Sequence, residues 1–257
     1  MNIGIYGLGR FGFLWARILS QKFQVYAYSR NPNRKSPPGI PRVSENDILK
    51  CDTIFLCVSI SAVDTVLQNI SDRIGPDTLI ADTSSVKVYP LECMKQRLPE
   101  QIEVMGTHPM FGPDSAKDGT KGLPIVVNTD SRAKSTTIDY WKNIFTQFGM
   151  QVLSMSSHEH DQEAAYTQGI THFVGRVLGD LHLKESRIAT LGYKKLLEII
   201  EQTCNDPWQL FSDLQNYNPY THDMRNDLKK SFEKIFSNFH SAVNEEHIID
   251  SNSKCDI

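Results

Sequence analysis

The segment Gly7–Gly12 limits the possible folds of this chain more than any other feature of the sequence. It reads Gly-Leu-Gly-Arg-Phe-Gly and so has the pattern G-x-G-x-x-G. A short apolar run, Asn2–Tyr6, comes before it, and a helical pattern, Phe11–Leu19, comes after it. Between a strand and a helix, these glycines allow a pyrophosphate to approach the backbone N–H groups at the positive end of the helix. The pattern therefore predicts a dinucleotide-binding βαβ unit at the start of the chain.

The end of the second predicted strand indicates which dinucleotide binds. NAD-binding versions usually place an Asp or Glu about 20 residues after the glycines, where it bonds the ribose 2′-hydroxyl. This chain has Ser29-Arg30 at the end of that strand, followed by Arg34. A hydroxyl and a guanidinium suit a 2′-phosphate, because Arg forms charge-assisted hydrogen bonds with phosphate. We therefore predict NADP as the cofactor, with the following residues in contact with it: Gly7, Leu8, Gly9, Arg10, Phe11, Gly12, Ser29, Arg30, Arg34 and Ser59.

Charge is unevenly distributed along the chain. The 257 residues include 27 basic and 30 acidic ones, which gives a net charge of −3. Residues 1–44 hold seven basic residues and no acidic one, so this segment carries +7 and the remainder −10. A small anionic ligand such as NADP accounts for the basic segment. We expect no nucleic-acid partner, because no aromatic residues alternate with the basic ones to stack bases.

Cysteine usage and hydropathy bear on the compartment. The chain has five cysteines and no C-x-x-C pair, which argues against a disulfide framework or a zinc site and fits a reducing environment. No stretch approaches the roughly 18 consecutive apolar residues of a membrane span, and no basic residue precedes an apolar run at the N-terminus as in a secretory signal. We therefore expect a cytoplasmic protein without a metal site or a membrane partner.

Short apolar runs alternate with helical patterns through the first part of the chain. Buried strands of a parallel sheet have this composition, and the alternation implies right-handed βαβ crossovers. Two helices have candidate caps, Ser44 with Asp47 and Ser61 with Asp64. The predicted strands are Asn2–Tyr6, Gln24–Tyr28, Thr53–Val58, Thr78–Ala81, Glu103–Met105 and Pro124–Val127.

The pattern changes after about Ser154, and from His160 onward it is helical. The clearest helix is predicted from His222 to Asn244, where one apolar stripe runs from Leu228 to Val243. We predict an α/β Rossmann-type parallel sheet domain over residues 1–155, an all-α domain for substrate binding and dimerisation over 156–245, and a flexible tail over 246–257.

Two further motifs follow predicted strands, at the edge where open α/β sheets bind ligands. The first is Asp82-Thr83-Ser84-Ser85-Val86-Lys87, and the second runs from Gly106 to Pro113 as Gly-Thr-His-Pro-Met-Phe-Gly-Pro. A histidine at a strand end is a candidate general base at neutral pH, since its ordinary pKa is near 6.5. His108 is therefore a candidate catalytic residue, although the residues alone leave a surface role equally open.

In these motifs and over nearly its whole length, the chain resembles the prephenate/arogenate dehydrogenase family of tyrosine biosynthesis. The similarity rests on the glycine segment, the Asp82–Lys87 motif, the Gly106–Pro113 motif, and a later His160-Asp161 with Thr171-His172. The segment from Thr171 to Leu178 and Ser29-Arg30 are most similar to the plant-type, NADP-dependent arogenate dehydrogenases.

The resemblance implies oxidative decarboxylation of a cyclohexadienyl substrate, with hydride transfer to NADP. It also implies a C-terminal arrangement like that of 6-phosphogluconate dehydrogenase. In this chemistry His108 accepts the proton of the ring hydroxyl, and Ser85 bonds the same region. The substrate carboxylates need cationic or N–H partners. For Arg176 a surface ion pair is an equally good explanation, and for His172 a structural role in helix packing is. The residues expected to contact substrate are Lys87, Thr107, His172 and Arg176.

Two departures from the family bear on the substrate. A second histidine found in many prephenate-using members is Gly175 here, and the turn before Asp206-Pro207-Trp208 lacks the Arg that many members carry. Arogenate has an ammonium where prephenate has a keto group, so an acid such as Glu201 suits it. We predict an arogenate dehydrogenase, with prephenate dehydrogenase as the alternative.

More distant alternatives use the same fold for other purposes. An imine or β-hydroxyacid reductase normally uses a Lys or Asp on the central helix, and a non-catalytic NADP sensor has no need of both Ser85 and His108. The helical domain also has more apolar surface than it can bury alone, which predicts a homodimer. Its glycines, at 169, 175 and 179, fit either close helix packing or clearance at the active site. The apolar residues behind the dimer prediction are Phe211, Leu214, Phe232, Phe236 and Phe239.

Overall fold

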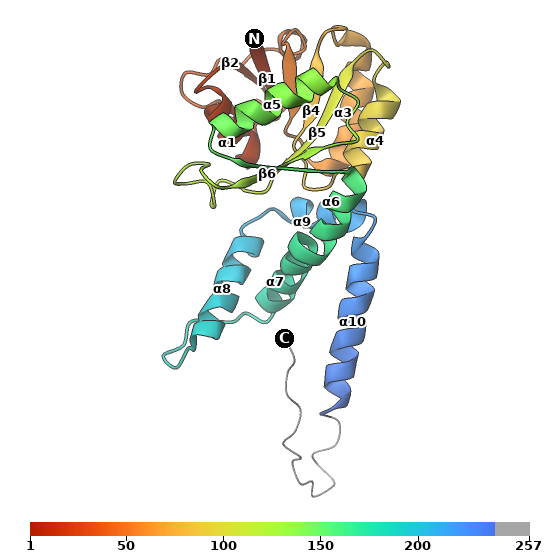
Figure 1. The fold of residues 1–257 in the computed structure, drawn as a ribbon. Coiled ribbons are helices and arrows are strands. Elements are labelled where there is room, and N and C mark those ends of the chain that lie inside the picture. The colour runs from red at the N-terminus through yellow and green to blue at the C-terminus, as the bar shows by residue number, and fades with distance from the viewer. Residues whose placement is uncertain (240–257) are drawn as a thin grey trace, which may run out of the picture.

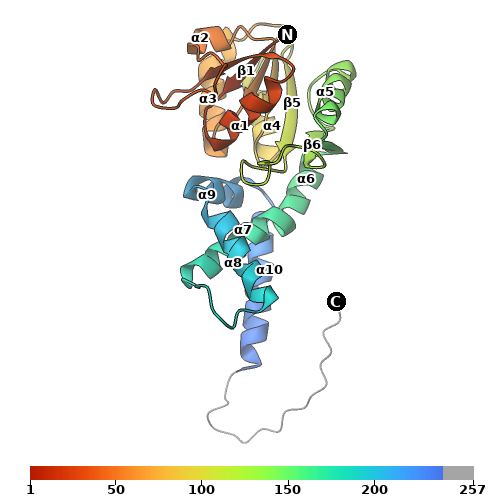
Figure 2. The same cartoon turned by 90° about the vertical axis from the view of Figure 1, so that its left-hand side faces the viewer.

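The computed structural model describes residues 1–239. They form a twisted sheet wrapped by helices, and a group of helices that extends away from one end of the sheet (Figure 1, Figure 2). Within this part of the chain, no helix is both long and apolar enough to cross a membrane. The predicted tail, 246–257, and the end of the predicted apolar stripe at Val243 lie outside the described residues.

Seven strands form the sheet, in the order β2-β1-β3-β4-β5-β6-β7. All six predicted strands are confirmed, while the seventh, β7, was not predicted. Its sequence, QVLSM, is half polar, and none of its side chains is fully buried, so it lacks the apolar run that marks the inner strands. The strands are β1 (Asn2–Tyr6), β2 (Gln24–Tyr28), β3 (Thr53–Leu56), β4 (Leu79–Asp82), β5 (Glu103–Pro109), β6 (Pro124–Asn128) and β7 (Gln151–Met155).

The parallel sheet predicted from the sequence is confirmed, and it contains one antiparallel pair that the sequence did not indicate. β6 pairs antiparallel with β5, with Thr107 opposite Val127, whereas β6 and β7 are parallel to each other. A parallel neighbour needs a crossover, usually a helix. Residues 110–123 contain no helix, so the chain turns back along the edge of β5 instead.

Helices cover both faces of the sheet. α1 (Arg10–Leu19) and α5 (Ser135–Gln147) pack on one face, and α2 (Glu45–Ile48), α3 (Val63–Ile70) and α4 (Val88–Arg97) pack on the other. Because side chains alternate along a strand, Phe55 of β3 joins the first core and its neighbours Ile54 and Leu56 join the second. The doubly wound fold predicted from the sequence is confirmed.

One of the two predicted helix caps is confirmed. Ser44 caps α2 by accepting a hydrogen bond from the Asp47 N–H. The predicted cap at Ser61 was wrong, because Ser61 lies inside a short 3₁₀ helix, η1 (Ile60–Ala62). Its N–H and hydroxyl instead donate to the Asp213 carboxylate, both at 3.0 Å. A second 3₁₀ turn, η2 (Ser71–Arg73), follows α3.

After β7, all the regular elements of the described chain are helices. α6 begins with a capping box of Ser156 and Glu159 and runs without a break through a π-helical segment, η3, into α7. The predicted helix from His222 is present as α10, which ends earlier than expected. The elements are α6 (Ser157–Ala164), η3 (Ala165–Gly169), α7 (Ile170–Asp180), α8 (Leu191–Cys204), α9 (Trp208–Tyr217) and α10 (Thr221–Ser237).

α9 joins the helices to the sheet domain and lies between the two in both views (Figure 1, Figure 2). Its Leu214 is completely buried against Ile60 and Val86, and the rings of Tyr217 and Tyr89 lie 4.5 Å apart. The division of the chain at residues 155 and 156 stays a prediction; it falls between the end of β7 and the start of α6.

Candidate active site

The glycine segment forms the turn between β1 and α1. Gly7 has a φ of 117°, a conformation that side chains rarely adopt, and a Cβ on Gly12 would overlap the carbonyl oxygen of Gly7. A Cβ on Gly9, in contrast, would point into open space. The first and third glycines are thus required by packing, and the second leaves the start of α1 open for a ligand. This cradle fits the pyrophosphate of a dinucleotide.

The side chains of this turn have different environments. Leu8 is buried, and Phe11 stacks on Trp15 with ring centroids 5.7 Å apart, so both support the turn from the protein side. Arg10 reaches away from the sheet and pairs with Asp114 at 2.7 Å and with Asp206 at 3.3 Å. It therefore connects the glycine turn with the loop after β5 and with the turn before α9.

The loop after β2 holds the residues predicted to bind the 2′-phosphate. Ser29 is partly exposed, and Arg30 and Arg34 are exposed. Arg42 was not among the predicted residues, yet it holds this loop together. Its guanidinium donates to four backbone carbonyls at 2.7 to 2.9 Å, those of Ser29, Asn31, Pro32 and Arg34. Ser59, after β3, is exposed at the N-terminus of η1.

His108 lies near the end of β5, almost completely buried, and contacts a histidine from the helical part. Its Nδ1 is 2.8 Å from Nε2 of His160, whose Nδ1 is 2.8 Å from Oδ1 of Asp161. The Asp161 carboxylate also accepts the N–H groups of Lys87 and Val88, at 2.7 and 2.9 Å. Burial lowers the pKa of His108 well below its ordinary value, and repulsion by His160, when that ring is protonated, and by the Lys87 ammonium lowers it further. His108 is therefore neutral at pH 7 and able to accept a proton.

Two residues expected to contact substrate point into the protein. The Lys87 ammonium is completely buried, pairs with the Asp82 carboxylate, and donates to the Thr107 carbonyl at 2.5 Å. The Thr107 hydroxyl donates to the Asp82 carbonyl at 2.6 Å. Their side chains thus connect the ends of β4 and β5 and hold the strand that carries His108.

The other predicted residues leave polar atoms without partners. Among residues 1–239, three of these atoms are buried and make no hydrogen bond: the Ser85 hydroxyl, Nδ1 of His172 and Nε of Arg176. The same is true of Oε1 of Gln168. Burying a polar atom without a partner is unfavourable, so these atoms fit a site that a polar ligand completes. Burial is the main reason that the pKa of His172 is lowered, with Asp206 acting in the opposite direction.

Arg176 packs against two neighbouring aromatic rings. Its guanidinium carbon is 5.6 Å from the ring centroids of both Trp208 and Phe211, and one amino group donates to the Asp206 carbonyl at 2.5 Å. The arrangement orients the guanidinium while its Nε stays free. Arg176 is therefore not part of a surface ion pair.

The acid suggested for an ammonium group is not the one that lies near these residues. Glu201 is exposed on α8. Asp206, two residues after α8, pairs with Arg10 and is close enough to His172 to affect its pKa. The sequence contained the Asp206-Pro207-Trp208 segment, but a linear sequence does not tell which neighbouring acid faces inward.

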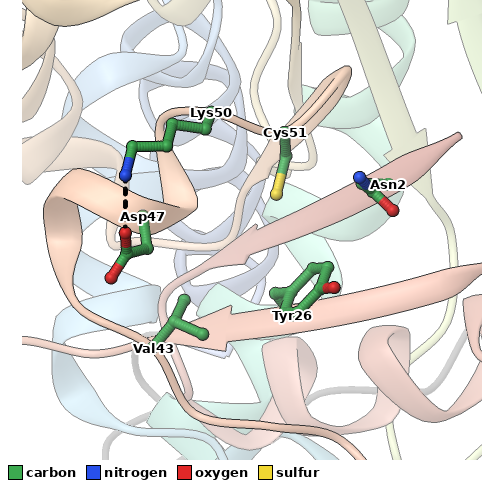
Figure 3. Close-up of a pocket in the computed structure, with 6 residues that line it drawn as sticks. All are labelled: Asn2, Tyr26, Val43, Asp47, Lys50 and Cys51. Atoms are coloured by element: carbon green, nitrogen blue, oxygen red, sulfur yellow. Dashed lines mark hydrogen bonds and ion pairs between the residues drawn. The ribbon is translucent and has the colours of Figure 1, made fainter.

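Sequence reasoning also missed the partnership of His160 and Asp161 with His108. The His-Asp pair at the start of a predicted helix was the available signal, but it gives no indication of the strand that the helix contacts. The pocket in Figure 3, about 210 Å³ and lined by Asn2, Tyr26 and Lys50 among others, lies by the first residue of β1. The pocket therefore lies near the amino end of β1, whereas the glycine turn follows the carboxyl end of that strand. Over residues 1–239, no group of His, Cys, Asp or Glu is placed to hold a metal ion.

Two family models match the chain. Residues 20–154 match the model described as prephenate dehydrogenase, nucleotide-binding domain, and residues 177–249 match the model described as TYRAAT1-like, C-terminal domain. The first match covers the sheet domain from the end of α1 to the last strand.

Named relatives and solved structures are similar to the chain over most of its length. Arogenate dehydrogenase 1, chloroplastic, from Arabidopsis thaliana is 35% identical over 96% of this chain, which spans 40% of that protein. Arogenate dehydrogenase 2, chloroplastic, from the same plant is 31% identical over 96% of the chain, which spans 72% of it. The crystal structure of prephenate dehydrogenase from A. aeolicus, with hydroxyphenyl propionate and NAD+, has a TM-score of 0.76 at 18% identity, covering 93% of this chain and 90% of that one.

Proposed function

Since the chain belongs to the prephenate dehydrogenase family, we propose that it oxidises and decarboxylates arogenate to tyrosine with NADP as the hydride acceptor. The observation that carries the proposal is the position of His108. It is a buried, neutral histidine at the carboxyl edge of the sheet, the edge where the open glycine turn also lies. An open cofactor cradle and a proton acceptor at one edge are what a dehydrogenation of an alcohol requires.

The glycine turn and the loop after β2 would hold the dinucleotide. The N–H groups at the start of α1 would bind the pyrophosphate, and Ser29, Arg30 and Arg34 would bind the 2′-phosphate. When bound, the nicotinamide supplies the hydride acceptor. The fold of the sheet domain supports a pyridine nucleotide as the cofactor. The choice of NADP over NAD rests on the missing carboxylate at the end of β2 and on the cationic loop that Arg42 holds together.

His108 would accept the proton of the ring hydroxyl. The O–H bond breaks, its proton goes to the imidazole, and the electron density left on oxygen favours loss of hydride from the same carbon. The C–C bond to the ring carboxylate then breaks, CO₂ leaves, and its electron pair completes the aromatic ring, whose phenolate oxygen takes back the proton held by His108. Ser85, whose hydroxyl has no partner within the described chain, would bond the reacting hydroxyl. The protein's main contribution is then orientation.

The polar groups of α7 and of the turn before α9 would hold the rest of the substrate. Arg176 and His172 have buried nitrogens without partners, which suit carboxylate oxygens. Asp206 is the acid that would pair with the ammonium of arogenate and thereby favour it over a keto group. Lys87 and Thr107, whose side chains bond within the protein, would act by holding the strand ends in place.

The test offers arogenate and prephenate separately to the purified protein, each with NADP and with NAD, and follows the nicotinamide absorbance. We expect the highest kcat/KM with arogenate and NADP. A preference for prephenate would replace arogenate dehydrogenase by prephenate dehydrogenase. Tight NADP binding without turnover of either substrate would support a cofactor sensor and contradict a dehydrogenase.

We also propose that the protein is a homodimer. α10 and the turn that follows it expose four large apolar side chains with exposed fractions of 43 to 78%, those of Phe232, Ile235 and Phe236 on the helix and of Phe239 just after it. Apolar patches of this kind on a helix mark a protein interface, and identical chains usually associate about a two-fold axis. The cytoplasmic location expected from the sequence stays a prediction.

A further inference from the structure

A line of three buried polar side chains leads from the proposed base into the helical part of the protein. The line runs from His108 on β5 through His160 to Asp161 on α6, and each junction is 2.8 Å long. The exposed fractions of the three residues are 4, 2 and 0%. Neither His160 nor Asp161 has a part in the mechanism derived so far.

Hydrogen-bond partners determine the protonation state at the inner end of the line. Oδ1 of Asp161 accepts the Lys87 N–H and Oδ2 accepts the Val88 N–H, both at the start of α4. A carboxyl group whose two oxygens both accept backbone hydrogens is ionised, because hydrogen bonds to the charged form favour it. The third contact of this carboxylate, from His160, must therefore be a donor, so Nδ1 of His160 carries a hydrogen.

The same reasoning continues to His108. A neutral imidazole has one donor nitrogen and one acceptor nitrogen. With its hydrogen on Nδ1, His160 offers the lone pair of Nε2, and Nδ1 of His108 has to donate to it. The lone pair of His108 is then on Nε2, the nitrogen that is not used inside the protein.

From this geometry we propose that His160 and Asp161 are positioning residues that fix the tautomer of His108, so that Nε2 faces the substrate hydroxyl as the proton acceptor. The inference rests on the proposed dehydrogenase function. When Nε2 gains the substrate proton, the positive charge on His108 is shared with His160 and balanced by the Asp161 carboxylate. The other charged groups near His108 are the Lys87 ammonium before α4 and its partner Asp82 on β4.

Two variants of His160 test the tautomer. In His160→Gln the amide oxygen can still accept the Nδ1 hydrogen of His108, whereas His160→Leu has a similar size and no acceptor. We expect kcat to fall by about ten- to a hundredfold in His160→Leu, the effect of losing a hydrogen bond to a group that becomes charged, and much less in His160→Gln. The KM for NADP should stay near that of the unmodified protein in both. Equal losses of kcat in the two variants would overturn the proposal.

A third variant, Asp161→Asn, tests the charge. Removing the carboxylate disfavours the protonated form of His108, so its pKa falls and the acid limb of the kcat/KM profile moves to lower pH while the plateau decreases. Asp130→Asn is the matched control, because Asp130 also accepts a backbone N–H at the start of α6, that of Ser157 at 2.9 Å, but does not contact the line. An Asp161→Asn profile that coincides with the control profile would overturn the proposal.

Nitrogen NMR of ¹⁵N-histidine-labelled protein tests the tautomer without turnover. The His108 signals are identified by their loss in His108→Asn. We expect a protonated Nδ1 and an unprotonated Nε2 in the unmodified protein and in His160→Gln, and a mixture in His160→Leu. This result would stand even if neither substrate were turned over, in which case the proposed function alone would fail. A protonated Nε2 in the unmodified protein would overturn the proposed tautomer.

Discussion

At the scale of single residues, Arg42 shows that a basic residue in a cationic segment can bond to the protein's own backbone. It is one of seven basic residues before Glu45, and the sequence suggested that this segment serves an anion. Its guanidinium donates to backbone carbonyls of the loop after β2 and therefore does not serve an anion. Arg10 is likewise paired, with Asp114 and Asp206. The exposed Arg30 and Arg34 remain at this loop to meet a 2′-phosphate.

Arg30→Ala tests the preference for NADP. Losing a charge-assisted hydrogen bond to phosphate costs about 1.5 to 3 kcal/mol, and since Arg30 is exposed we expect the low end, about a tenfold higher Kd for NADP. The Kd for NAD should stay unchanged, because NAD has no 2′-phosphate. Arg17→Ala is the control, an equally basic and exposed change on α1. Fluorescence titrations with both cofactors measure the effect, and equal weakening of NADP and NAD would contradict the assignment.

Lys87 and Thr107 show where sequence reasoning about the site stops. The motifs at the ends of β4 and β5 were found correctly, because strand ends at the carboxyl edge are visible in the sequence. Both residues were expected to contact substrate, yet their side chains bond within the protein. A motif specifies residues and spacing, while the direction of a side chain depends on packing between distant segments. For the same reason, the His160-Asp161 motif alone predicts no role for His160.

At the scale of elements, the π-helical segment η3 sets the orientation of α7. Twelve residues separate His160 from His172, and in a regular α-helix that spacing rotates one residue by about 120° relative to the other. The single extra residue of a π-turn takes back about 100°, so both histidines face a similar direction. Gln215 supports the segment by donating to the Gly169 carbonyl at 2.8 Å. Hydrophobic periodicity does not reveal such a segment, because one extra residue barely alters the pattern.

The contact between α7 and α8 depends on glycine. A Cβ on Gly175 would overlap the Thr203 hydroxyl, and one on Gly179 would lie 2.8 Å from Sγ of Cys204. The sequence left close packing and active-site clearance open for these glycines, and at both positions the neighbour is α8. A histidine in place of Gly175 has no room in this arrangement.

Gly175→Ala should therefore destabilise the protein. Overpacking costs about 1 to 3 kcal/mol, and the better helix propensity of Ala returns up to about 1 kcal/mol. We expect a net loss of about 1 to 2 kcal/mol in the free energy of unfolding, measured by urea denaturation. Gly192→Ala on α8 is the matched control, since the nearest atom to its Cβ is 3.9 Å away, and should be neutral or slightly stabilising. If both variants had the same stability, the contact would not be tight.

At the scale of the whole molecule, the two parts differ in how they bury apolar surface. The sheet domain has a core on each face, and the sequence predicted it well because its inner strands are almost wholly apolar. The helical part has few fully buried side chains, among them Leu214 and Met224, and Leu214 packs against the sheet domain. Most of its other apolar residues are half-buried or exposed, so this part of the fold is not explained by one chain alone.

Sedimentation of the Phe236→Glu variant tests whether a second copy covers α10. Phe236 is 61% exposed and stacks on Phe232 with ring centroids 6.2 Å apart. Burying a Phe contributes about 1.5 to 3 kcal/mol, and a two-fold interface contains it twice, so the dimer Kd should rise by about a hundredfold or more. Tyr140→Glu on α5 is the control, because Tyr140 is 42% exposed on the sheet domain and should leave the dimer intact. An unmodified protein that is monomeric at micromolar concentration would contradict the proposal, and the apolar face of α10 would then need another partner.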